Sequence, residues 1–142
     1  MRAWFILLAG MIGLLPGLTA GASVPTSVEW VDGESGRMNG RPFRLHDVDA
    51  PAANGVGAGV RAAACERESE LGFEARAFMA ELTRGKPVVM TASYGTDARG
   101  RQILDLSVDG EDIATAGLEA GMLKVWREDM RGETGARPDW CG

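Results

Sequence analysis

Alternating apolar and polar positions near the beginning of the chain predict three short strands joined by tight turns. Residues 27–31 alternate, and the turn dipeptide Asp32-Gly33 follows them. Residues 37–38 and 41–48 then flank Asn39-Gly40, the dipeptide that most strongly indicates a two-residue hairpin turn. The pattern therefore predicts a small antiparallel meander.

A helical period replaces this alternation over residues 61–84, which predict one long helix. Gly85 follows the last turn and is predicted to end the helix as its C-cap. The Gly- and Ala-rich residues 53–59 before the helix predict a flexible loop. The apolar positions of the helix recur at spacings of four, three and four, as one stripe facing a core requires; they are Leu71, Ala75, Phe78 and Leu82.

The second half of the chain returns to alternation. Residues 88–92 and 101–108 predict two strands, and Asp112 is placed to cap a short helix over residues 113–120. The complete order is three strands, a long helix, two strands and a short helix. Five strands with a helix between the third and the fourth are compatible with a β-barrel with helices of the five-stranded OB-fold type, although many α+β folds share this order.

Residues 1–22 predict a signal peptide that precedes the domain. Arg2 is followed by an apolar run over residues 3–15, and Ala20-Gly21-Ala22 is typical of a small-residue cleavage site. The run is shorter than the roughly 20 apolar residues that a membrane-spanning helix needs, although an uncleaved anchor is the alternative. The sequence predicts an exported protein, periplasmic or secreted, with one mature domain over residues 23–142 and no stable membrane span after cleavage.

The charge balance is acidic. The chain has 15 Lys and Arg against 20 Asp and Glu, a net charge of −5, and loss of residues 1–22 would change it to −6. This sign argues against a dedicated nucleic-acid coat protein, whose surface needs an excess of positive charge. It does not exclude a local basic cleft.

Two cysteines, Cys65 and Cys141, fall in the predicted mature domain. In an exported chain an even pair favours a disulfide, which would tie the C-terminal segment to the middle of the chain. A loop of this length corresponds to about 4 kcal/mol of stabilisation in the chain-entropy account. A structural metal site has less support, because only His46 is available to join the cysteines and no CxxC motif occurs.

Several short motifs are weak singly but informative in their order and spacing. Together they resemble the staphylococcal nuclease-like (thermonuclease) family over about residues 27–126. The family patterns are Asp-Gly-Asp-Thr, Arg-Leu-x-Gly-Ile-Asp-Ala-Pro-Glu, a Gly-x-x-Ala helix, Asp-x-Tyr-Gly-Arg and a closing strand, turn and helix. The matching segments here are Asp32-Gly33-Glu34-Ser35, Arg44-Leu45-His46-Asp47-Val48-Asp49-Ala50-Pro51-Ala52, Gly72-Phe73-Glu74-Ala75, Asp97-Ala98-Arg99-Gly100-Arg101, and residues 108–113 with 117–123.

The resemblance implies a phosphodiesterase site with one Ca²⁺ ion. Arg44 and Arg101 match the two arginines that bind the scissile phosphate and stabilise its growing charge. Asp49 matches a metal carboxylate, and the Ala50 carbonyl matches the neighbouring backbone ligand. Glu34 stands where the family has a metal-binding Asp; it keeps the charge and is one methylene longer, which the variable oxygen geometry of Ca²⁺ tolerates.

The main departure from the family is Ala52, which stands where the family has its catalytic Glu. A methyl group neither accepts a proton nor orients water, so the general base is missing. Arg99 likewise replaces the Tyr of the Asp-x-Tyr-Gly-Arg motif.

Three hypotheses follow for the function. The first is a degenerate nuclease that keeps at most a cleft for phosphate or metal, with nucleic acid or nucleotide as a weak partner. The second is a working secreted Ca²⁺-dependent phosphodiesterase, acting on DNA or RNA, in which another acid or water replaces the missing base. The third is a protein-interaction module on the same barrel. The retained Arg44, Asp49 and Arg101 favour the first two, and Ala52 favours the first over the second.

Overall fold

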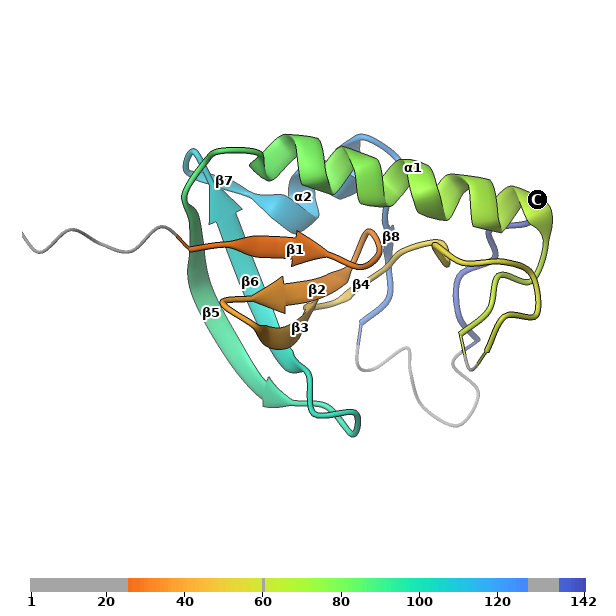
Figure 1. Ribbon diagram of the computed structural model, residues 1–142, viewed down its shortest axis with the longest axis horizontal. Coiled ribbons are helices and arrows are strands. Elements are labelled where there is room, and N and C mark those ends of the chain that lie inside the picture. Colours follow the sequence, from red (N-terminus) through yellow and green to blue (C-terminus); the bar gives the residue numbers. More distant parts are fainter. Residues whose placement is uncertain (1–25, 60, 128–135) are drawn as a thin grey trace, which may run out of the picture.

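The computed structural model describes residues 26–59, 61–127 and 136–142, and the predicted signal peptide lies outside them. The described residues form a mixed α+β fold with two helices and eight strands (Figure 1). In chain order these are β1 (Val28–Trp30), β2 (Ser35–Met38), β3 (Arg41–Leu45), β4 (Val48–Asp49), α1 (Glu66–Thr83), β5 (Val88–Thr96), β6 (Gln102–Val108), β7 (Glu111–Asp112), α2 (Ile113–Glu119) and β8 (Lys124–Val125).

The larger sheet has the strand order β1-β2-β3-β6-β5, and β7 pairs with β6. Its pairs are antiparallel except for β3 and β6, which run parallel. A second sheet consists of β4 and β8 alone. Pairing along the larger sheet ends at β1 and β5, so the sheets of the described residues do not close into a barrel, and they contain more strands than the five that the sequence predicts.

The hairpin of β2 and β3 forms as its turn residues predict. Asn39 and Gly40 both adopt positive φ, of 50° and 80°, which matches the two-residue turn that a twisted hairpin favours. The hairpin brings Phe43 into the core, where its ring meets Trp30 edge to face at 5.4 Å between centroids. Most of the other core side chains are aliphatic: Leu45, Val48, Ala50, Met79, Val88, Leu104, Leu106, Val108, Ile113 and Leu123.

The strand predicted over residues 41–48 is in fact two strands. The chain turns at His46 and Asp47, and Asp47 adopts a positive φ of 58°. The His46 amide donates to the Leu104 carbonyl at 3.0 Å at this point. Because of the turn, β4 leaves the large sheet and pairs with β8, which places Asp49 beside the C-terminal part of the chain.

Helix α1 begins at Glu66 rather than at residue 61 as predicted. Cys65 is extended and its sulfur accepts from the Glu68 amide at 3.4 Å, so it caps the helix. The predicted apolar stripe is also partly wrong, because of its members only Ala75 is buried and Phe78 and Leu82 pack at the margin of the core. The buried face of α1 contains Gly72 instead. A Cβ at Gly72 would lie 2.2 Å from the Ala52 carbonyl oxygen, so this face of the helix packs closely against the preceding loop.

The remaining elements follow their signals closely. Asp112 caps α2 by accepting from the Thr115 amide at 2.7 Å, and Gly85 follows α1 with a positive φ of 66°, as predicted. Strand β5 is longer than predicted and ends at Thr96. In the described part of the chain, no helix is long and apolar enough to cross a membrane.

Candidate functional site

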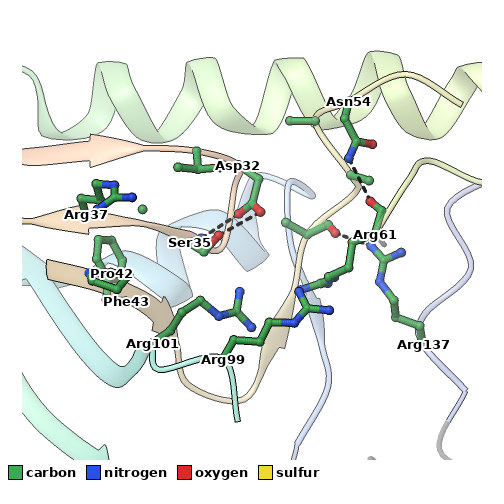
Figure 2. Close-up of a pocket in the computed structure, with 15 residues that line it drawn as sticks. Asp32, Ser35, Arg37, Pro42, Phe43, Asn54, Arg61, Arg99, Arg101 and Arg137 are labelled. Carbon is green, nitrogen blue, oxygen red and sulfur yellow. Dashed lines mark hydrogen bonds between the residues drawn. The ribbon is translucent and has the colours of Figure 1, made fainter. Parts of the chain in front are cut away.

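A cavity of about 310 Å³ lies where the β1–β2 turn, the β2–β3 hairpin, the β5–β6 turn and the segments around Asp49 meet. The sticks in Figure 2 show arginines entering it from several elements. Asp32 is the one acidic side chain among the described residues that line it. Five basic side chains line the same space: Arg37, Arg61, Arg99, Arg101 and Arg137.

Glu34 is directed inward by the turn between β1 and β2. The Asp32 carboxylate accepts from the Glu34 and Ser35 amides at 2.9 and 2.7 Å and from the Ser35 hydroxyl at 2.9 Å. This side-chain-to-backbone pattern is the usual way in which Asp stabilises a turn. As a result the Glu34 side chain is only 1% exposed.

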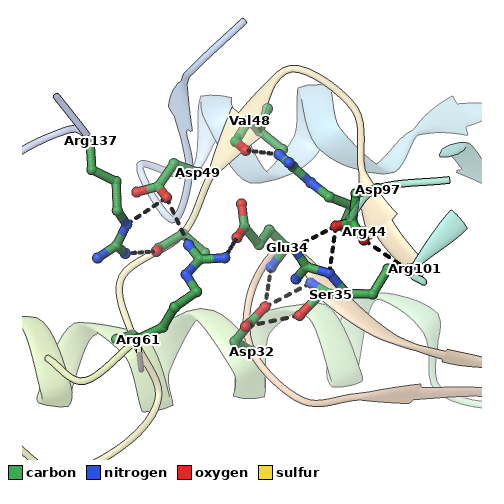
Figure 3. A network of polar contacts seen from close by, with 12 residues as sticks. Asp32, Glu34, Ser35, Arg44, Val48, Asp49, Arg61, Asp97, Arg101 and Arg137 are labelled. Carbon is green, nitrogen blue, oxygen red and sulfur yellow. Dashed lines mark hydrogen bonds and ion pairs between the residues drawn. The ribbon is translucent and has the colours of Figure 1, made fainter. Parts of the chain in front are cut away.

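Arg61 joins Glu34 to Asp49. One terminal nitrogen of its guanidinium is 2.8 Å from Glu34 Oε1, and the other is 3.2 Å from Asp49 Oδ1 (Figure 3). The Asn54 side chain holds the segment that carries Arg61, because it donates to the Arg61 carbonyl at 3.1 Å and accepts from the Ala63 amide at 3.0 Å. The residues between β4 and α1, described as 50–59 and 61–65, are called the capping loop below.

A second guanidinium reaches the same carboxylate from residues 136–142, called the C-terminal strap below. Arg137 Nε lies 2.8 Å from Asp49 Oδ1, one terminal nitrogen donates to the Ala50 carbonyl at 2.8 Å, and the other is 3.1 Å from Glu68 Oε1. The Trp140 indole donates to Asp49 Oδ2 at 2.8 Å. Asp49, which is completely buried, therefore accepts from three side chains.

The disulfide predicted between Cys65 and Cys141 is present, with 6.1 Å between the Cα atoms. It joins the C-terminal strap to the residue that caps α1. The Lys124 ammonium lies 4.3 Å from the centre of the Trp140 ring and donates to the Asp139 carbonyl, so β8 also contacts the strap. The bridge and these contacts together hold Arg137 at the cavity.

The two arginines predicted to bind phosphate lie in different surroundings. Arg101 lines the cavity, and Asp97 Oδ2 is 2.8 Å from both its Nε and one terminal nitrogen, which sets the orientation of the guanidinium. Arg44 is 6% exposed, donates to the Val48 carbonyl at 3.4 Å and does not belong to the lining (Figure 3). Arg101 is therefore directly accessible from the cavity, whereas Arg44 lies behind it.

Glu34 and Glu68 are both buried, but their pKa values are shifted in opposite directions. Burial raises the pKa of Glu34 above its usual value, and the opposing effect of Arg61 is smaller. Glu34 Oε2 has no hydrogen-bond partner among the described residues. Burial also acts to raise the pKa of Glu68, but amide hydrogen bonds from Ala64 and Ala52, together with Arg137, outweigh it and leave this pKa below its usual value.

Glu68 lies next to Ala52 but is poorly suited to act as a general base. Its carboxylate accepts from the Ala52 amide at 3.2 Å and from the Ala64 amide at 2.7 Å, and it pairs with Arg137. A carboxylate with a depressed pKa and several donors already bound is a weak general base near neutral pH. Its role in this structure is to hold Arg137 and the capping loop.

The predicted calcium ligands do not fit a calcium ion in this arrangement. Glu34, Asp49 and the Ala50 carbonyl do come together, as predicted, but their oxygens accept from Arg61, Arg137 and Trp140. Calcium takes six to eight oxygen ligands, whereas here the oxygens already have guanidinium and indole donors. Among the described residues, no group of three or more His, Cys, Asp or Glu side chains is arranged to hold a metal.

No sequence motif marks four of the residues that build this site: Arg61, Glu68, Arg137 and Trp140. Arg61 and Glu68 both fall within the helix predicted over residues 61–84, where no motif distinguishes them. The position of Arg137 and Trp140 close to Cys141 was the one available signal, because the disulfide was predicted to bring this segment to the middle of the chain.

No family model matches the chain, and no curated protein matches it either.

Proposed function

We propose that this protein is an exported, nuclease-like domain that binds a phosphate-bearing ligand in its arginine-lined cavity and does not hydrolyse phosphodiesters efficiently. The observation that carries the proposal is the set of five arginines around one cavity of about 310 Å³. Guanidinium groups bind phosphate oxygens through paired hydrogen bonds, which a lysine does not reproduce. The ligand class includes nucleotides and the backbone of single-stranded nucleic acid.

The topology supports a relationship to OB-type folds. A meander of β1, β2 and β3 continues through a parallel pair to β6 and then to β5, with α1 between β4 and β5. OB folds are five-stranded barrels that are often partly open, and the larger sheet here is open between β1 and β5. The disulfide supports export, because such bonds persist in oxidising compartments.

Three features argue against efficient hydrolysis. Ala52 provides no carboxylate, and the neighbouring Glu68 is held by amides and Arg137. The oxygens that would bind calcium accept from arginine side chains instead. General-base catalysis contributes about 10²–10⁴-fold to such reactions, so its loss alone would leave a slow enzyme.

Isothermal titration of the oxidised protein with a nucleoside 3′,5′-bisphosphate, in EDTA, tests this proposal. We expect Arg101→Ala to weaken binding about tenfold or more, because a hydrogen bond to a charged group contributes about 1.5–3 kcal/mol. Added salt should also weaken binding. Arg84→Ala is the matched control, because Arg84 is exposed and pairs only with Glu81 in the structure as described.

Parallel titrations with sulfate and citrate distinguish phosphate recognition from general attraction to anions. Equal binding by wild type, Arg101→Ala and Arg84→Ala would overturn the proposal. Rapid calcium-dependent cleavage of DNA or RNA by the wild type would instead support the second hypothesis, a working phosphodiesterase.

A further inference from the structure

Four oxygen-bearing groups from separate parts of the chain converge on Arg61 and Arg137, two of the side chains that line the cavity. Glu34 comes from the β1–β2 turn, Asp49 from β4, the Ala50 carbonyl from the start of the capping loop, and Glu68 from α1. The three carboxylates are at most 2% exposed. Buried carboxylates are strongly destabilising unless a cation and hydrogen bonds compensate them, so this cluster requires positive charge.

Two guanidinium groups supply that charge. Arg61 spans Glu34 and Asp49, and Arg137 reaches Asp49 from the other side (Figure 3). Arg137 also contacts the Ala50 carbonyl and Glu68. Each arginine makes its contacts through separate nitrogens, as the planar fork of a guanidinium allows. Both side chains also line the cavity, so their cationic groups lie between the carboxylates and the open space.

We propose that Arg61 and Arg137 act as built-in cations in the position between Glu34, Asp49 and the Ala50 carbonyl that a divalent cation would otherwise take. The cavity then presents fixed positive charge to an anion without a metal. Its ligand binding, which rests on the proposed function, is metal-independent. Wild-type protein does not take up calcium here, because guanidinium nitrogens already lie against Glu34 Oε1, Asp49 Oδ1 and the Ala50 carbonyl.

Different contacts hold Arg61 and Arg137 in place. Asn54 holds the Arg61 segment through two hydrogen bonds with the capping loop. The Cys65–Cys141 disulfide and the Trp140–Asp49 hydrogen bond hold the strap that carries Arg137. The arginines are therefore parts of a built cluster, because a local pair of hydrogen bonds fixes one segment and long-range contacts fix the other.

The calcium dependence of thermal unfolding tests the proposal. Wild type should unfold at the same temperature, within about 1 °C, in EDTA and in millimolar CaCl₂ at equal ionic strength. Arg61→Ala/Arg137→Ala should unfold at a lower temperature in EDTA, because buried carboxylates lose their partners. Calcium at about 100 times its Kd should then raise the Tm of this variant by more than about 5 °C.

Two further variants locate the calcium response. Arg37→Ala/Arg99→Ala removes two arginines from the same cavity that make no ion pair with Glu34, Asp49 or Glu68 among the contacts described, and it should remain indifferent to calcium. Adding Asp49→Asn to the Arg61→Ala/Arg137→Ala protein should abolish its response. If the double variant does not fold even with calcium, Arg61→Ala alone should show a smaller calcium-dependent rise in Tm.

Calcium stabilisation of the wild type that disappears in Asp49→Asn would overturn the proposal. So would the absence of any calcium response in both Arg61→Ala and the double variant. Titration of the wild type with nucleoside 3′,5′-bisphosphate, with and without EDTA, should give affinities equal within about twofold, and dependence on metal would also overturn the proposal. If no bisphosphate binds at all, the proposed function fails, while the calcium measurements still decide the role of the arginines.

Discussion

The large sheet and the site that lies beside it are held together by different forces. The sheet of β1, β2, β3, β6 and β5 encloses an apolar core in which Phe43, Leu45, Leu104 and Leu106 are completely buried. The capping loop and the C-terminal strap contribute few large apolar side chains, and ion pairs, hydrogen bonds and one disulfide hold them in place. Stability therefore depends mostly on one region, and the candidate chemistry on the other.

The difference also concerns the distance along the chain over which contacts form. Hairpin pairs such as Met38 and Arg41 are close in sequence and are set by a two-residue turn. Arg137 and Asp49 are 88 residues apart, and Trp140 and Asp49 are 91 apart. Long-range polar contacts cost more chain entropy before they form, which explains why a covalent bridge accompanies them here.

The largest effect is expected from Phe43→Ala. Its ring is completely buried against Trp30, and truncation of a buried Phe to Ala typically costs about 3–5 kcal/mol through lost burial and the cavity left behind. Because the sheet supports both regions, the loss should appear as one cooperative transition at lower denaturant concentration. Chemical denaturation followed by circular dichroism measures this loss. Separate transitions for the sheet and the strap would contradict the expectation that the two regions unfold together.

A smaller and more local effect is expected from Cys65→Ser/Cys141→Ser. Removal of the bridge should lower stability by about 2–4 kcal/mol, mainly by releasing entropy in the unfolded chain. Hydrogen exchange should increase in the C-terminal strap and the capping loop more than in β3 and β6. Two controls lack the same bridge: the single variant Cys141→Ser, and wild type under reducing conditions. Uniform exchange across the protein would show that the strap is not a separate unit.

The smallest effect is expected from Glu68→Gln, and it should depend on pH. At pH 7 this change removes a charged partner of Arg137 and should cost about 1–3 kcal/mol. Because the pKa of Glu68 is lowered in the folded protein, its contribution is present above its ordinary pKa of 4.5 and is lost as the pH falls through the folded value. The cost of the substitution should therefore shrink in acid.

Glu34→Gln should show the opposite trend with pH. The pKa of Glu34 is raised by burial, so its protonated form contributes stability at low pH, and this contribution is lost as the pH rises through the folded pKa. Glutamine resembles the protonated acid. The free energy of unfolding of the variant, relative to that of wild type, should therefore be most favourable at neutral pH. Urea unfolding of both variants at pH 4 and pH 7 measures the trends, with exposed Glu81→Gln as control, and parallel trends would contradict the assignment.

Much of the sheet was predictable because its signals are local. The Asn39-Gly40 turn, the Asp112 cap and the Gly85 helix end each depend on a few neighbouring residues, and each is found where predicted. The turn at Asp47 was not predictable from the pattern, because an alternating strand and two short strands with a tight turn look alike. The start of α1 was missed because Arg61 and the alanines after it favour helix locally, while Cys65 and the ion pairs of Arg61 determine the observed course.

The site was only half predictable for the same reason. The motifs compared with the nuclease-like family predicted one site for Glu34, Asp49, Ala50 and Arg101. The structure places these residues near one cavity. It gave no indication that Arg61 and Arg137 would contact the carboxylates. Charge pairing between residues so far apart has no periodicity. Position along the chain does not distinguish these two arginines among the 15 Lys and Arg of the sequence.

The disulfide also links the candidate site to the redox state of the protein. Cys65 caps α1, and through Cys141 it positions Arg137 and Trp140 at Asp49. Under reducing conditions the same chain contains every residue of the cavity but lacks the covalent link that keeps the strap in place. The oxidised and reduced proteins are therefore expected to differ in how firmly Arg137 and Trp140 are held at Asp49, so the geometry of the candidate site depends on the thiol–disulfide state of the protein.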